Sequence, residues 1–259
     1  CPQNLKLATL QDFSFFDTWL GTDSTLDIAR SLHYILSLET NPWEGYDLNV
    51  DLYYKSLENI NEIRRDVLEV KTGRDVLFQG KGEAFGVELF IQKKFGDFTG
   101  WFGYALGYIN VQFDSLNGGR YFRPKYDRRH DFKGVIQYKI NDHWDVGLNY
   151  TFQTGQSYTG QTSRFQEVLV GETNGRGKTI PSERYGLRLP PSHQLNLNGS
   201  YKFDAFGYDA KLLLDIYNVY NRRDIWFRFY NTNEDVTTVE DFRLLPIIPT
   251  FSFEIKFEN

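Results

Sequence analysis

The sequence predicts an all-β chain that folds as an antiparallel, up-and-down transmembrane β-barrel. Three observations support this fold class. Apolar and polar residues alternate along much of the 259 residues, short and long connections alternate between the resulting strands, and Tyr and Trp gather near the strand ends. No segment approaches the run of about 18 apolar residues that a membrane-spanning helix needs, so a membrane would have to be crossed by strands.

The alternation is clearest in residues 144–153. Trp144, Val146 and Leu148 fall on one side of an extended strand, and Asp145 and Asn149 fall on the other. The same period of two recurs in roughly nine segments. These segments are 31–39, 46–55, 83–94, 99–114, the two strands within 126–155, 193–203, 208–221 and 249–259. A soluble β-sandwich alternates in the same way, so this observation alone leaves both folds open.

The connections favour the barrel. Tight turns are expected near 41–45, 95–98, 141–143 and 204–207, and long links near 60–82, 115–127, 157–190 and 231–247. Short and long connections therefore alternate along the chain. Outer-membrane barrels have this rhythm because their periplasmic turns are short and their extracellular loops are long.

Aromatic residues make up 17% of the chain, with 17 Tyr and 22 Phe. Tyr and Trp near strand ends are expected at the headgroup level of a membrane, where barrels carry aromatic girdles. The residues in question are Trp43, Tyr46, Trp101, Trp144, Tyr158, Trp226 and Tyr230. We therefore expect the apolar face to meet lipid and the polar face to line a lumen.

The first 30 residues are expected to be an irregular loop, with a short capped helical turn in 24–32. The chain has no Met, and nothing at its start looks like a signal peptide. Bacterial barrels have an even number of strands, so the missing strands are expected upstream, in a longer protein of which residues 1–259 form part of one barrel domain. Cys1 is either a lipid-modified N-terminal cysteine or simply the residue where a fragment starts.

Several segments, taken in order, resemble the C-terminal part of the barrel of TonB-dependent outer-membrane receptors. They are "GKGEAFGVELFIQKKFGDFTGWFGYALGY" (80–108), "YDRRHDFKGVIQYKINDHWDVGLNYTFQTGQSYT" (126–159), "LPPSHQLNLNGSYKF" (189–203), "DIYNVYNRRDIWF" (215–227) and "LLPIIPTFSFEIKF" (244–257). The resemblance covers about residues 30–258 and implies part of a barrel of about 22 strands. It departs from the family at the end, where Phe257 is followed by Glu258 and Asn259 rather than closing the chain.

The resemblance also implies a function and partners. The family takes up scarce nutrients such as ferric siderophores across the outer membrane, using energy delivered by the inner-membrane protein TonB. The implied partners are TonB, reached through an N-terminal plug domain that is absent here, a small nutrient ligand, outer-membrane lipid and the barrel assembly machinery. The implied location is the cell outer membrane. The alternative is a soluble or surface-exposed β-rich binding module without transport activity, which would purify without detergent.

The sequence shows no catalytic or metal-binding motif. The four His are scattered, there is no cysteine pair, and no P-loop or nucleophile elbow occurs. We therefore expect no enzyme activity, no metal site and no cofactor. The net charge of −5 does not suggest nucleic-acid binding.

Ligand-contacting candidates lie in the long links and at the strand rim. Arg and aromatic residues on a loop suit an anionic ligand such as a ferric chelate. The candidates are Arg120, Tyr121, Arg123, Arg129, His130, Trp226 and Arg228. The alternatives are a structural charge network for the cluster at 127–131 and an ordinary solvated loop for 117–126.

Overall fold

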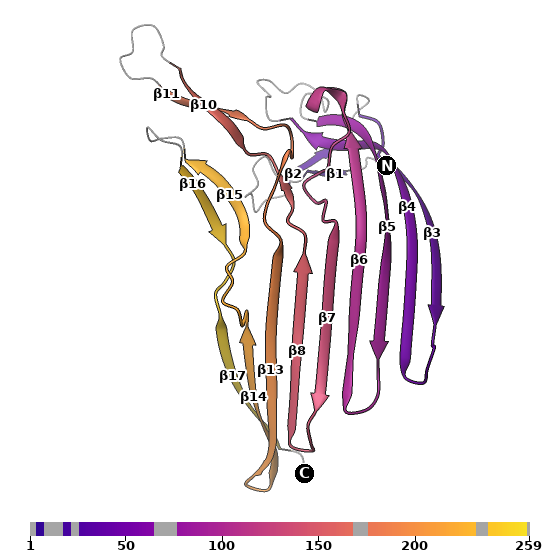
Figure 1. The fold of residues 1–259 in the computed structure, drawn as a ribbon, viewed down its shortest axis with the longest axis vertical. Coiled ribbons are helices and arrows are strands. Elements are labelled where there is room, and N and C mark those ends of the chain that lie inside the picture. Colours follow the sequence, from indigo (N-terminus) through magenta and orange to yellow (C-terminus); the bar gives the residue numbers. More distant parts are fainter. Residues whose placement is uncertain are drawn as a thin grey trace.

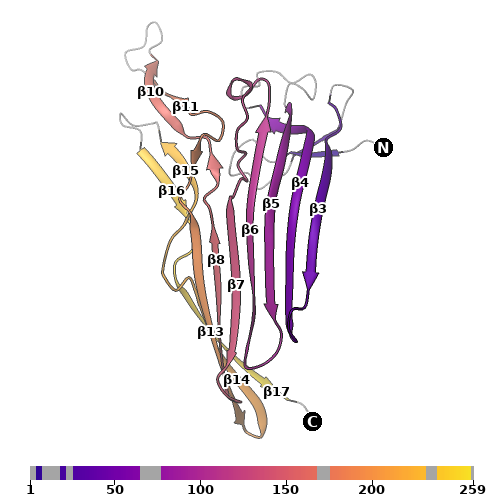
Figure 2. The same ribbon diagram turned by 45° about the vertical axis from the view of Figure 1, so that its right-hand side comes forward.

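The computed structural model describes residues 4–7, 18–21, 26–64, 77–167, 176–231 and 238–257. Its main feature is one nine-stranded antiparallel sheet, which Figures 1 and 2 show as a tall wall a single layer thick. The strands are β3 (Arg30–Thr40), β4 (Tyr46–Ile63), β5 (Leu77–Lys93), β6 (Phe98–Gln112), β7 (His130–Lys139), β8 (Trp144–Gln153), β13 (Ser192–Ala205), β14 (Tyr208–Tyr217) and β17 (Ile248–Lys256).

Each of these strands pairs with the next one along the chain, in the order β17-β14-β13-β8-β7-β6-β5-β4-β3. The predicted up-and-down antiparallel arrangement of nine strands is therefore confirmed. The sandwich alternative is wrong for these strands, because they form one sheet instead of two packed sheets. Within the described residues, β3 and β17 are each paired on one side only.

The predicted rhythm of the connections is also confirmed. Figure 1 shows the tight turns at the lower end of the sheet and the long links at the upper end. The turn between β13 and β14 places both Phe206 and Gly207 at positive φ, at 60° and 81°. Two consecutive positive φ angles match the twist of a two-residue hairpin, and Gly207 adopts this conformation without steric cost.

The long links contain further short elements. They are the 3-10 turn η1 (Asn117–Gly119) and the strands β9 (Ser157–Tyr158), β10 (Gln161–Glu167), β11 (Arg176–Pro181), β12 (Leu187–Arg188), β15 (Ile225–Asn231) and β16 (Thr238–Arg243). The pairs β10–β11, β12–β9 and β15–β16 are antiparallel. Figure 1 shows β10–β11 and β15–β16 above the upper ends of β8, β13 and β14.

Two expectations for the first 32 residues were wrong. The segment predicted as irregular contains β1 (Asn4–Leu7) and β2 (Thr18–Gly21), which pair antiparallel. The helical turn expected in 24–32 is absent from residues 26–32, where β3 already begins at Arg30. Pairing with β4 over eleven residues outweighs the weak helical propensity of a single turn.

The two faces of the sheet differ sharply. Residues directly opposite each other on paired strands carry their side chains on the same face. One row across β7, β8, β13, β14 and β17 is Ile136, Leu148, Leu197, Ile216 and Pro249. A row on the opposite face, across β4 to β8, is Asp51, Glu88, Ala105, Asp131 and Gln153.

The apolar face is not covered by any element that the structure describes. Leu36 is 70% exposed and Phe251 is 76% exposed. Within the described residues, the buried apolar side chains are Leu26, Leu77, Val111, Phe113, Leu189 and Ala210. Because so little apolar surface is buried inside the chain, the wall depends on an apolar environment outside it for hydrophobic stabilisation.

Aromatic pairs mark the lower end of the apolar face. Trp43 packs edge-on against Tyr46 with ring centroids 5.7 Å apart, and Trp144 lies 4.7 Å from Tyr201. Trp101, expected in the same girdle, is an exception. It pairs with Gln92 and Val135 in a row on the polar face, where it stacks on Phe90 at 6.0 Å.

No helix in the part of the chain that the structure describes is long and apolar enough to cross a membrane.

The assignment of the faces makes a testable prediction in β8. Leu148 lies between Ile136 and Leu197 on the apolar face, and the adjacent Asn149 lies on the polar face. In the membrane-inserted full-length protein, Leu148→Arg should cost about 2–4 kcal/mol, because a charge would enter hydrocarbon. Asn149→Arg should be tolerated. Urea unfolding of both variants in lipid vesicles measures the difference, and equal destabilisation would contradict the facing.

Candidate functional site

The long links at the upper end of the sheet are joined by ion pairs, and the first of these centres on Glu62. Glu62 lies near the end of β4 and accepts hydrogen bonds from Arg184 Nε at 3.1 Å and from the Tyr185 hydroxyl at 2.9 Å. Asn117 donates its side-chain N–H to the Arg184 carbonyl at 3.0 Å and accepts from the Arg184 backbone N–H at 2.7 Å. Two links and the end of β4 are thus held at one point.

This cluster is largely shielded from water, with side-chain exposures of 11% for Arg184 and 17% for Glu62. Burial lowers the pKa of Arg184, but the hydrogen bond and charge of Glu62 raise it by more, so the net shift is upward. The guanidinium therefore stays charged, and its charge is compensated by a single carboxylate.

A second connection joins Asp127 to Arg188. Asp127 is fully buried and forms an ion pair with Arg188. The Arg188 guanidinium also donates to the carbonyls of Asp127 at 3.0 Å and Gly155 at 2.6 Å. This pair fixes the link that precedes β7 against the end of β12.

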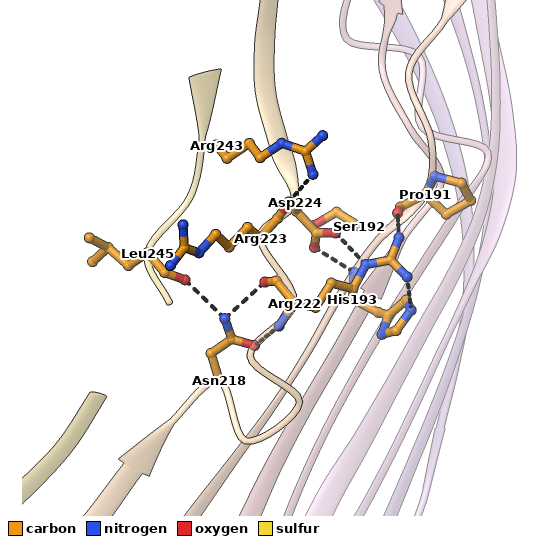
Figure 3. Close-up of polar contacts among 9 residues, drawn as sticks. All are labelled: Pro191, Ser192, His193, Asn218, Arg222, Arg223, Asp224, Arg243 and Leu245. Atoms are coloured by element: carbon orange, nitrogen blue, oxygen red, sulfur yellow. Dashed lines mark hydrogen bonds and ion pairs between the residues drawn. The ribbon is translucent and has the colours of Figure 1, made fainter. Parts of the chain in front are cut away.

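Figure 3 shows a third connection, where the link between β14 and β15 meets the start of β13. Arg222 donates to Asp224 at 2.5 Å, to His193 Nε2 at 2.6 Å and to the Pro191 carbonyl at 2.8 Å. Asp224 also accepts from the Ser192 hydroxyl at 2.7 Å and from the His193 backbone N–H at 2.9 Å. Because a guanidinium can only donate, the facing nitrogen of His193 must be an unprotonated acceptor.

The β15–β16 hairpin carries a bidentate pair. Arg228 donates to the two carboxylate oxygens of Asp241 at 2.6 and 3.0 Å. The hydrogen bond from Arg228 holds the pKa of Asp241 below its usual value, and the pKa of Arg228 is raised in turn, chiefly by Asp241. The side chain of Arg228 is therefore occupied inside the hairpin.

An open cleft of about 390 Å³ lies among these connections. Its lining includes Tyr121, Arg123, Ser157, Arg184, Tyr185 and Arg188. Arg184 and Arg188 are already paired with carboxylates. Arg123 is exposed and has no hydrogen bond or ion pair to any residue that the structure describes. Its charge is therefore available to an anion entering the cleft.

The structure separates the sequence-predicted candidates into distinct places. Tyr121 and Arg123 line the cleft. Arg120 follows η1 and pairs with Glu183, with side-chain exposures of 71% and 60%. Arg228 is bound to Asp241, and the neighbouring Trp226 is about half exposed in an aromatic group with Phe227 and Phe242.

Arg129 and His130 lie elsewhere, on the apolar face. His130 pairs with Leu106, which continues the row of Val87, Leu52 and Leu36. The guanidinium of Arg129 lies over the ring of Tyr108, 4.2 Å from its centroid. This placement argues against contact of either residue with a ligand on the polar face.

The remaining residues of the cluster at 127–131 form the structural charge network that was the alternative interpretation. Arg128 donates to Gln153, and Gln153 donates to Asp131 at 2.7 Å. Glu62, Arg184, Tyr185 and Arg188 were missed by the sequence reasoning. Their only signal was the grouping of Arg and Tyr in 183–188, and their partner Glu62 lies 122 residues away from Arg184.

No protein-family model matches the sequence, and no curated protein matches it. Solved structures do match the fold. The ferripyoverdine receptor of the outer membrane of Pseudomonas aeruginosa aligns with 88% of this chain at 13% identity and a TM-score of 0.57. The ferric-catecholate import receptor Fiu of E. coli aligns with 90% at 13% identity and 0.56, and the ferric citrate transporter FecA with 86% at 13% and 0.51.

The chain has the fold of part of a TonB-dependent receptor barrel. It spans 27%, 29% and 30% of the length of these three proteins, so it corresponds to less than a third of each. By their names, these three proteins are receptors or transporters. At this identity the likeness concerns the fold and identifies no ligand.

The Glu62 cluster provides a prediction about the rigidity of the links. Glu62→Ala should destabilise them by about 1.5–3 kcal/mol, because the shielded Arg184 charge loses its partner. The matched control is Glu183→Ala, which removes an exposed pair and should cost at most about 1 kcal/mol. Hydrogen exchange on the full-length protein should speed up in residues 113–127 and 182–190 only for Glu62→Ala. Similar exchange in both variants would contradict the role of Glu62.

Proposed function

We propose that this chain forms part of the barrel wall of an outer-membrane receptor that takes up a scarce nutrient, such as a ferric siderophore, with energy supplied through TonB. The observation that carries the proposal is the single-layer sheet with one apolar and one polar face, in the fold of a TonB-dependent receptor barrel. In this arrangement the apolar face meets lipid in the outer membrane and the polar face lines the lumen.

The proposal accounts for the two edges of the sheet, β3 and β17, which are each paired on one side only within the described residues. Unpaired N–H and C=O groups along a sheet edge cost several kcal/mol each in lipid, so an inserted sheet has to close on itself. In a complete barrel, further strands would pair with the free sides of β3 and β17. The polar face would then surround the plug domain through which the receptor contacts TonB.

The cleft beside Arg123 is the proposed place of first contact with the ligand. A guanidinium binds carboxylate and similar anionic oxygens with paired hydrogen bonds, and the ring of Tyr121 provides an apolar surface next to it. Ferric chelates present oxygens of this kind at their surface. The surrounding ion pairs hold the links in place, so that the cleft is formed before the ligand arrives.

Uptake by cells tests the proposed function. Deletion of the whole gene should abolish uptake of at least one chelate from a panel of radiolabelled ferric citrate and ferric catecholates, and loss of TonB should have the same effect. The complete protein should need detergent for purification and should migrate differently on a gel after heating. Unchanged uptake of the whole panel, or purification as a monomer without detergent, would instead favour the binding-module alternative.

Within that assay, Arg123→Ala should weaken binding of the transported chelate about tenfold, which corresponds to the loss of one charge-assisted hydrogen bond. The matched control is Arg120→Ala, three residues earlier in the same link, where Glu183 already compensates the charge. Equilibrium binding to whole cells measures both variants. An equal loss of affinity for the two substitutions would show that Arg123 has no specific role in binding the chelate.

A further inference from the structure

Arg129 stands out as a cation at the upper end of the apolar face. Its guanidinium lies over Tyr108, and Tyr108 stacks on Phe85 with ring centroids 5.3 Å apart. Tyr108, Phe85, Tyr54 and Tyr34 are paired in one row across β6, β5, β4 and β3. The row directly below it contains Leu106, Val87, Leu52 and Leu36. Arg129 therefore lies where the apolar surface gives way to aromatic hydroxyls.

The charge of Arg129 has no counter-ion among the described residues. No hydrogen bond or ion pair joins its guanidinium to them, and its Nε is buried without an acceptor. Asp127, two residues earlier, is paired with Arg188 through one carboxylate oxygen, and its other oxygen has no partner among the described residues. Asp131 is held by Lys133 and Gln153. Glu83, opposite Asn110 on the same face, forms no ion pair with Arg129. Because a guanidinium is always charged, a partly buried one without a counter-ion among its neighbours calls for an external anion.

His130 adds a second donor beside Arg129. The guanidinium of Arg129 lies over Tyr108, and His130 pairs with Leu106. Tyr108 and Leu106 lie on the same face of β6, so both consecutive side chains reach the apolar face. The ring of His130 stacks on Tyr104, and its Nδ1 is 2.8 Å from the Tyr104 hydroxyl. When that hydroxyl donates to Nδ1, the other ring nitrogen, Nε2, carries the hydrogen and can donate outward.

The height of this pair along the sheet matches a membrane surface. Phe98 belongs to the lower aromatic end of β6, where Lys93 lies 5.6 Å from its ring. Tyr108 follows ten residues later, about 33 Å along the strand at roughly 3.3 Å per residue. At a strand tilt of about 40°, this is about 25 Å along the membrane normal, the height of the apolar band of a barrel.

We propose that Arg129 and His130, supported by Tyr108 and Tyr104, bind a phosphate group of a membrane lipid headgroup on the side of the long links. The inference rests on the proposed function, because it requires the apolar face to be in a membrane. The site presents donors and aromatic surface without a carboxylate ion-paired to it, which suits a phosphate next to acyl chains. A nutrient captured on the polar face would not reach it.

Lipid binding by the complete protein in non-ionic detergent tests the site. The probes are lipid A, which carries phosphates, its dephosphorylated form, and inorganic phosphate. Arg129→Ala should weaken lipid A binding by about tenfold or more, and Arg129→Lys should retain most of it. The matched control is Lys55→Ala. Lys55 also lies over an aromatic ring, Tyr53 at 5.1 Å, but on the polar face, so its loss should leave lipid A binding unchanged.

Three results would overturn the inference, and one further measurement separates it from the proposed function. Equal binding of lipid A by Arg129→Ala and the unmodified protein, or equal binding of the two lipid forms, would overturn the inference. Displacement of lipid A by inorganic phosphate alone would also overturn it, because the site would then be a general anion site. Heat-dependent migration of the same samples on a gel reports the barrel separately. Its absence would defeat the proposed function, whereas its presence with unchanged lipid binding would defeat only this inference.

Discussion

Pairing of the backbone across one continuous sheet is the constraint on which the rest of the structure depends. The seven inner strands are paired on both sides, and β3 and β17 are paired on one side within the described residues, in an unbroken antiparallel order. In hydrocarbon no water is available to replace these bonds, so the strands must be long and paired in register. The period of two along each strand then divides the side chains into one apolar and one polar face.

A single-layer wall of this kind has only a small apolar core, and part of it, including Phe113 and Leu189, lies at the links. The links are also positioned by charge, through Arg184 with Glu62, Arg188 with Asp127, Arg222 with Asp224 and Arg228 with Asp241. Each carboxylate is at most 17% exposed, so these pairs are shielded far better than a surface pair such as Arg120 with Glu183. Arginine suits this role because its planar group can bond several oxygens at once, as Arg222 does.

Two arginines, Arg123 and Arg129, form no ion pair with any residue that the structure describes. Arg123 lies in a cleft formed by the paired links, and Arg129 lies on an aromatic ring at the edge of the apolar face. In the proposed membrane orientation, the first lies among the long links above the membrane and the second lies at the lipid headgroups. The same residue type thus has two different environments, although both arginines lie in the link between β6 and β7.

The sequence by itself determined the nine strands, their alternating faces and the alternation of short turns with long links. These features depend on local patterns of two to ten residues, which can be seen without any knowledge of distant contacts. Only the tertiary structure decided which charges meet, because Glu62 and Arg184 are 122 residues apart. It also decided the side of the sheet on which Arg129 lies. Arg129 lies at a bend before β7, and its guanidinium lies over Tyr108, on the same face as the side chain of His130. Simple alternation would have separated the two residues.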